Sequence, residues 1–174
     1  MAAYMAANQS IEENMQEVVA DRAGDLRWTK TAYFRAGLYV DRLATIFDLL
    51  VLISTGALTA VLLQGWISIR GQLLLSAVAT TFSLVSLVWD LDTLANEYKK
   101  NGEMYNSLLK EFEEFYHLIL LNDAYTVEEK QNELEKLAEQ HRNLNEMTTP
   151  PSDWIYKRIS EDDLGGTKDF DRLD

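Results

Sequence analysis

Hydrophobic residues are concentrated in the middle of the chain, in two long runs. Residues 43–63 contain a single charged residue, Asp48, and residues 72–89 contain none. A helix needs about 20 mostly apolar residues to cross the ~30 Å core of a bilayer. The pattern therefore predicts an all-α membrane protein with a transmembrane helical hairpin over residues 43–89. Its short connection holds Trp66 and its end holds Trp89, and both suit a membrane–water interface.

The alternative is a pair of buried helices in a soluble bundle. A helix in such a bundle normally shows one polar face, and neither run does. The polar residues of both runs are mainly Ser and Thr, whose hydroxyls can bond to carbonyls of their own helix. We therefore favour the membrane interpretation.

The segment before the first run, residues 1–42, has the pattern of an amphipathic helix. Ser10 and Glu13 form a capping box that predicts a helix start at Ile11, and apolar residues then recur at steps of three or four, with a weak point at Gly24. Residues 26–42 interleave basic and aromatic side chains. Beside a membrane span, this favours contact with lipid headgroups over binding of nucleic acid, and the candidate contacts are Arg27, Lys30, Arg35 and Arg42.

After Trp89, apolar residues continue at near-heptad spacing to Ile119, so we expect the helix to continue, interrupted only at residues 101–102. A turn follows at residues 122–123, and a second capping box, Thr126 with Glu129, predicts a helix from residue 127 to about 147. Residues 90–149 should thus form a cytoplasmic helical hairpin. The side chains expected between its helices are Phe112, Phe115, Tyr116, Leu134 and Leu137. Residues 150–174, which begin with two prolines, form an acidic tail.

The chain carries 28 acidic and 16 basic residues, a net charge of −12, which argues against a partner rich in phosphate such as duplex nucleic acid. Basic residues precede the first run and follow the second, at Lys99 and Lys100, whereas the connection holds only Arg70. The positive-inside rule then places both termini in the cytoplasm and makes the chain a multi-pass protein of the inner (plasma) membrane.

Sites of chemistry are not evident. The chain has no cysteine, and its two histidines, His117 and His141, are too far apart for a helical metal pair. No nucleotide-binding loop or nucleophile motif occurs. We predict a protein that is not an enzyme and that has no cofactor or metal site.

Polar residues line up on both predicted spans. On the first, Asp48, Thr55 and Thr59 lie at i, i+7 and i+11; on the second, the i, i+4, i+7 positions are Ser76, Thr80 and Ser83. Gly56 and Ala60 form a small-xxx-small pair suited to close helix packing. Two interpretations stay open: a water-facing surface inside an oligomer, or hairpin packing with Asp48 reaching the interface.

The layout resembles the SLATT family of small two-transmembrane proteins associated with nucleotide-signalling conflict systems. The resemblance is carried by residues 30–39 (KTAYFRAGLY), by the two apolar runs and by the helix that ends within residues 134–156. It implies a homo-oligomeric membrane effector of prokaryotic antiviral defence that depolarises the membrane and arrests growth. It also implies a separately encoded partner that makes or senses a nucleotide signal. The alternative function is a non-conducting anchor or scaffold that recruits a soluble partner through the apolar seam of residues 91–119.

Overall fold

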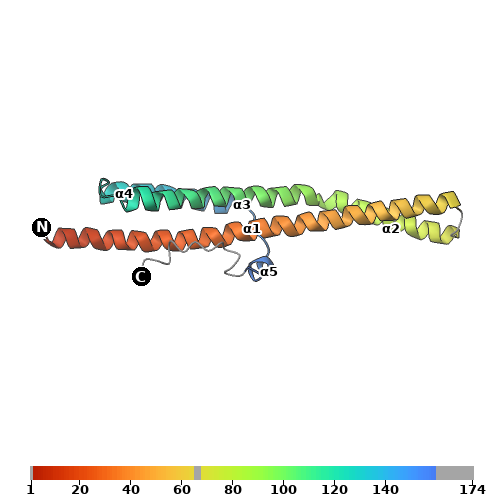
Figure 1. Ribbon diagram of the computed structural model, residues 1–174, viewed down its shortest axis with the longest axis horizontal. Coiled ribbons are helices and arrows are strands. Elements are labelled where there is room, and N and C mark those ends of the chain that lie inside the picture. Colours follow the sequence, from red (N-terminus) through yellow and green to blue (C-terminus); the bar gives the residue numbers. More distant parts are fainter. Residues whose placement is uncertain (1, 65–67, 160–174) are drawn as a thin grey trace. The chain divides into compact units, whose positions relative to one another are not determined.

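The computed structural model describes residues 2–64 and 68–159, and all regular structure in these ranges is helical (Figure 1). This confirms the predicted all-α class. The elements are α1 (Ala2–Gln64), α2 (Ile69–Trp89), α3 (Leu91–Glu114), the π-helical η1 (Phe115–Leu120), α4 (Val127–Met147) and α5 (Asp153–Tyr156). The predictions for the side chains of Trp66 and Trp89 and for the tail from residue 160 onward lie outside what the structure describes.

The chain forms two compact units. Residues 36–97 make one, called here the hairpin unit, and residues 1–35 together with 98–174 make the other, called here the bundle unit. The helix α1 contributes to both. The sequence pattern treats residues 1–42 as a segment of its own, but the structure packs residues 1–35 with the C-terminal half of the chain.

The predicted start of the first helix is wrong. Helix α1 begins at Ala2, and Ser10 lies inside it instead of capping it. Four of residues 2–7 are alanine, the best helix former, so the helix extends past the capping box without a break. Gly24 does not interrupt it either, and α1 continues for 63 residues.

The expected continuous helix after Trp89 is also interrupted. Asp90 takes a left-handed conformation, with φ 35° and ψ 56°, which ends α2 and begins α3. Aspartate tolerates this conformation better than most residues because its short side chain can bond locally. Here Asp90 Oδ1 accepts a bond from the Thr93 N–H at 3.4 Å, and so caps α3. Residues 101–102, where the pattern suggested an interruption, are helical.

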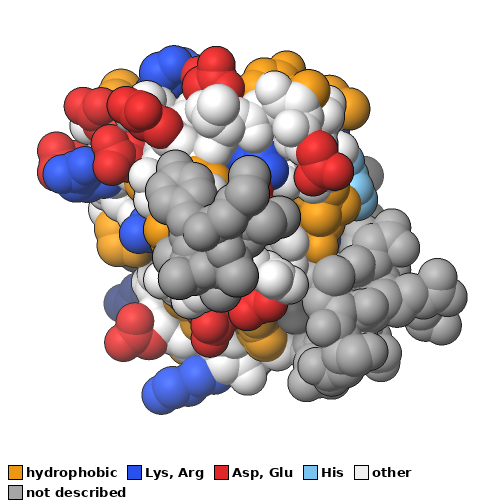
Figure 2. All heavy atoms as spheres, turned by 90° about the vertical axis from the view of Figure 1, so that its left-hand side faces the viewer, with side chains coloured by type: hydrophobic (Ala, Val, Ile, Leu, Met, Phe, Trp, Pro, Cys, Tyr) orange, Lys and Arg blue, Asp and Glu red, His pale blue; other side chains and the backbone are white. Residues whose placement is uncertain are grey.

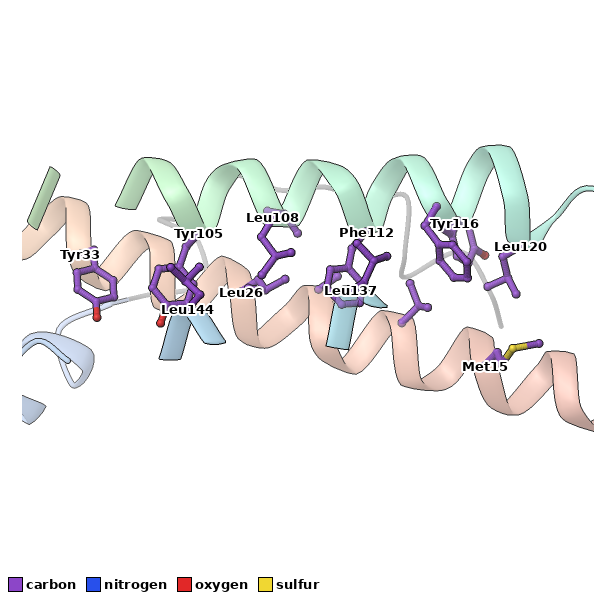
Figure 3. Packing of buried hydrophobic residues seen from close by; sticks show 14 residues of the cluster. Met15, Leu26, Tyr33, Tyr105, Leu108, Phe112, Tyr116, Leu120, Leu137 and Leu144 are labelled. Atoms are coloured by element: carbon purple, nitrogen blue, oxygen red, sulfur yellow. The ribbon is translucent and has the colours of Figure 1, made fainter. Parts of the chain in front are cut away.

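The core of the bundle unit is built from three helices, not from a two-helix hairpin alone. Helix α1 supplies Met15, Val19, Ala23, Leu26 and Tyr33 to one apolar cluster with α3, η1 and α4. Figure 3 shows Leu26 of α1 close to Leu108 of α3, and on either side of this pair Leu144 of α4 lies near Tyr105 and Leu137 near Phe112. The expected inward residues of the hairpin are all present in or against this cluster. Ile11 and Val18, in contrast, are exposed.

The turn and the second capping box are confirmed. The Thr126 hydroxyl accepts a bond from the Glu129 N–H at 3.3 Å, and Glu129 Oε2 accepts one from the Thr126 N–H at 2.8 Å. The π-helical turn η1 was not predicted. Its wider turn brings Phe115, Tyr116 and Leu120 into the core while Leu118 stays exposed.

Polar contacts fix the position of α1 against α3 and α4. The Lys130 ammonium, whose side chain is 2 % exposed, donates to Glu12 Oε1 at 2.6 Å. The Tyr105 hydroxyl donates to Asn145 Oδ1 at 2.7 Å. Gly102 lets α3 approach α1 closely, because a Cβ there would lie 3.2 Å from the ring of Phe34. Together these contacts hold α1, α3 and α4 in one register.

Candidate functional site

The surface of the hairpin unit is largely apolar. Within the described residues, one helix, α1, is long and apolar enough to cross a membrane, and only 6 % of its most apolar 18-residue stretch is buried. The corresponding stretch of α2, Ile69–Val85, is shorter. The core helix of a soluble protein is mostly buried, whereas this stretch is exposed. The large exposed side chains are Leu38, Leu43, Ile46, Leu49, Leu52, Ile53, Ile69, Leu73, Leu74, Val78 and Leu84.

The bundle unit has a different surface. Figure 2 looks onto the end of this unit that holds the turn between η1 and α4, and acidic and basic side chains cover much of that face between separate apolar patches. Such a mixture is typical of a surface that faces water. The contrast between the two units therefore follows the charge distribution along the sequence.

Small side chains mark the packing seam of the hairpin unit. Within residues 43–60 of α1, Ala44 and Ser54 are the buried residues, at 5 % and 9 % exposure, and Phe47 lies 5.9 Å from Phe82 of α2, measured between ring centroids. Positions 44, 47 and 54 lie on one face of the helix, so α1 contacts α2 along a single stripe. The remaining faces of α1 stay open.

Asp48, Thr55 and Thr59 lie on these open faces, and all three side chains are exposed. The hydroxyls of Thr55 and Thr59 donate to the carbonyls of Val51 and Thr55 at 2.7 and 2.9 Å. Asp48 has no hydrogen bond or ion pair to the residues that the structure describes. The predicted polar stripe of the first span is thus accessible on the outside of the single chain.

The polar residues of α2 divide between two environments. Thr80 and Ser83 are exposed, and their hydroxyls donate to the carbonyls of Ser76 and Ala79 at 2.8 and 2.9 Å. Ser76 is half-buried. Because hydroxyl groups bonded within their own helix do not oppose burial in lipid, these bonds are compatible with a membrane span as well as with a water-facing surface.

Gly56 and Ala60 do not form the packing seam of the hairpin. Both residues are exposed, and a Cβ added to Gly56 would meet no atom within 4 Å. Their predicted role in close helix packing stays a prediction.

The four basic residues proposed for headgroup contact have different surroundings. Arg27 forms an ion pair with Glu113 at 3.3 Å, and the Lys30 ammonium donates to Asn106 Oδ1 at 3.2 Å. Burial lowers the pKa of Lys30 below its usual 10.5, and Glu113 partly offsets this effect. Arg35 donates to the carbonyl of Arg158 at 2.5 Å, and Arg42 is exposed. Headgroup contact stays a prediction for all four, but Arg27 and Lys30 have partners on α3.

Similarity to known proteins gives no further guidance. Comparison with protein families, curated proteins and solved structures found no match. The functional argument therefore depends on the residues of this chain.

Histidine and acidic side chains are the candidate metal ligands of this chain. Among the described residues, no group of three or more histidine or acidic side chains is placed to hold a metal ion. His141 is buried against Tyr105, with 6.5 Å between the ring centroids, whereas His117 is exposed. Sequence reasoning missed the buried Lys130–Glu12 pair, since lysine in a polar helix is normally solvated and its partner lies 118 residues away.

Proposed function

We propose that residues 43–63 of α1 and residues 72–89 of α2 cross a bilayer as a two-span hairpin with both termini in the cytoplasm. The supporting observation is the exposed apolar surface of the hairpin unit. The basic residues at its two open ends and the single Arg70 in the connection support the orientation.

The hairpin then functions as a homo-oligomeric pore. The observation that carries this step is Asp48 in line with Thr55 and Thr59 on an open face of α1. A charged side chain in a span costs about 3 kcal/mol near the bilayer centre and less near its edge, so it normally faces protein or water. In a ring of copies, the stripe of Asp48, Thr55 and Thr59 would face neighbouring copies or the water of a central pore. The exposed pair Gly56 and Ala60 allows close contact between neighbouring copies.

In this assembly the candidate pore-lining residues are Asp48, Thr55, Thr59, Ser76, Thr80 and Ser83. Asp48 lies about 8 Å inside the span, counted from Leu43 at 1.5 Å per residue, and its carboxylate near the cytoplasmic mouth favours cations. Following the resemblance to SLATT proteins, we assign the pore to prokaryotic antiviral defence. Opening would depolarise the membrane and arrest growth, and a separately encoded protein would supply the nucleotide signal.

The test is ion flux through liposomes that contain the purified full-length chain, read from the reversal potential in a KCl gradient. The wild type is expected to conduct with a preference for K⁺. Asp48→Asn should reduce the cation-to-anion permeability ratio about fivefold or more, because a ring of carboxylates is lost. The matched control is Asp21→Asn, an exposed acid of the same helix outside the proposed span. Absence of flux, together with an unchanged membrane potential in cells that overproduce the chain, contradicts the pore.

A second function, a non-conducting scaffold, has one supporting observation. Most apolar residues of the seam between positions 98 and 119 pack inside the bundle unit. A shallow groove of about 340 Å³ stays open between α3 and α4, however, and its apolar lining includes Met104, Leu108, Leu144 and Met147. Met147 is exposed and Met104 is partly buried, and methionines suit adaptable binding surfaces. A scaffold would leave the membrane potential intact on overproduction, which distinguishes it from a pore.

A further inference from the structure

We propose that His141 makes the attachment of α4 to α1 and α3 sensitive to protons, so that protonation of its imidazole favours a locally open state of α4. All residues involved belong to the bundle unit, so this inference does not depend on the proposed pore. The opening is assigned to one helix and is therefore distinct from a general loss of stability in acid.

His141 occupies a core position of α4. Its side chain is 6 % exposed, and Leu137 and Leu144, one turn away on either side, belong to the apolar cluster shared with α1 and α3. From α3, the ring of Tyr105 lies edge-on to the imidazole, with 6.5 Å between the ring centroids. The Tyr105 hydroxyl itself donates to Asn145 at 2.7 Å. An imidazole in this position becomes fully hydrated when α4 moves away from its partner helices.

One ring nitrogen of His141 lacks a hydrogen-bond partner. This atom, Nδ1, is buried, and no partner for it occurs among the residues that the structure describes. In the neutral imidazole one nitrogen is a donor and the other an acceptor, whereas both are donors in the protonated ring. Protonation of His141 therefore places a positive charge and an N–H donor without an acceptor in the core. Both are costly in an apolar environment.

The charged groups that act on the imidazole come from α1. Arg22, which is half-buried, opposes a positive charge on His141, and Asp25, which is exposed, favours it to a smaller extent. Burial has the largest effect, so that the pKa of His141 lies below its usual 6.5. The residues one turn away in α4 and the facing residue of α3 add no carboxylate: Leu137, Ala138, Leu144, Asn145 and Tyr105.

Proton binding is thereby linked to the opening of α4. In a locally open state, His141 is in water and has the usual histidine pKa of about 6.5. The open state then binds a proton more readily than the closed state, and the equilibrium constant for opening rises as the pH falls through this value. If the closed state bound no proton, the rise between pH 7.5 and 5.5 would be about tenfold. Because the closed state also binds the proton in part, we expect a rise of about three- to tenfold.

The experiment measures amide hydrogen exchange by mass spectrometry on the full-length chain in detergent micelles at pH 7.5 and 5.5. Each rate is divided by the rate of an unstructured peptide at the same pH, which leaves the opening equilibrium. The protection of residues 137–147 of α4 should fall about three- to tenfold at pH 5.5. Residues 103–112 of α3, a helix that keeps its contacts with α1 through Glu113 and Asn106, should change less than about twofold. A change below twofold in α4, or an equal change in both helices, would overturn the proposal.

Substitutions identify the group that takes up the proton. Histidine is the one side chain of this chain whose ordinary pKa lies between 5.5 and 7.5, and there are two, His117 and His141. His141→Leu and His141→Gln should each abolish the pH effect, and two variants are used in case one folds poorly. The matched control is His117→Gln at the exposed histidine of η1, which should keep the full effect. A pH effect that survives in a folded His141 variant, or that disappears in His117→Gln, contradicts the assignment.

The neighbouring charges provide a readout that a purely structural role of His141 would not change. Arg22→Gln should make the pH effect on α4 smaller, because the closed state then binds the proton more readily. Asp25→Asn should make it larger, because the favourable carboxylate is lost. Equal pH effects in the two variants, or the reverse order, would show that the imidazole of His141 is not the sensor.

Discussion

Replacing Glu12 by Gln tests whether the start of α1 belongs to the core of the bundle unit. The substitution leaves the Lys130 ammonium, 2 % exposed, without the carboxylate that it contacts at 2.6 Å. Removing one partner of a fully buried pair costs about 3–5 kcal/mol, and an exposed pair contributes at most about 1 kcal/mol. Because the Glu12 side chain is 33 % exposed, we expect an intermediate loss of about 2 kcal/mol in the free energy of local opening.

A loss of this size corresponds to roughly 30-fold faster amide hydrogen exchange along α4 when exchange follows the opening equilibrium. The assay is hydrogen exchange read by mass spectrometry on the full-length chain in detergent micelles. Glu133→Gln is the matched control, because the Lys136–Glu133 pair has the same 2.6 Å distance but side-chain exposures of 65 % and 43 %. Its effect should stay below about 0.5 kcal/mol.

The double variant Glu12→Gln/Lys130→Met tests the same pair with the charge of the lysine removed as well. Methionine fills the space of the lysine stem without a charge, so it should restore most of the lost protection, since a buried pair can often be replaced by apolar residues at little cost. Equal effects of Glu12→Gln and Glu133→Gln, or a double variant less protected than Glu12→Gln alone, would refute the packing of α1 described above.

Two further predictions concern the same unit. Burial lowers the pKa of His141 below its usual 6.5; Arg22 lowers it further and Asp25 raises it. The neutral form is therefore favoured in the folded state, and its contribution to stability is complete above pH 6.5 and decreases as the pH falls below this value. His141→Leu should reduce the fall of the thermal midpoint between pH 7.5 and 5.5, and an unchanged fall would contradict this assignment. Gly102→Val should destabilise the unit by about 2 kcal/mol because Phe34 occupies the space. Gly24→Ala, where a Cβ meets nothing within 4 Å, should stabilise it by about 0.5–1 kcal/mol, and equal denaturation midpoints for the two variants would contradict the close approach.

Features that depend on local sequence were predictable. The capping box at Thr126 and Glu129, the turn before it and the end of α4 were all found at the expected residues, because hydrogen bonds within a few residues determine them. The long apolar stretch within α1 likewise follows from the composition of residues 43–63. The stripe of Thr55 and Thr59 on one face follows from helical periodicity alone.

Features set by competing local preferences or by distant contacts were not predictable. The capping box at Ser10 is a real pattern, but the alanine-rich residues before it continue the helix, so a local signal was overridden by another local preference. The break at Asp90 needs a left-handed residue that the sequence does not distinguish from an ordinary helical aspartate. The core face of α1 includes Val19 and leaves the neighbouring Val18 exposed; both residues are apolar, so only the partner helices select between them.

The continuity of α1 connects the proposed site to the rest of the molecule. The same helix carries Met15, Leu26 and Tyr33 in the core of the bundle unit and Asp48 and Thr59 on the open face of the hairpin unit. Within the bundle unit, α1 is held by its contacts with Lys130, Glu113 and Thr149. If opening of the proposed pore requires α1 to turn or shift, variants that remove these contacts should lower the threshold for activation.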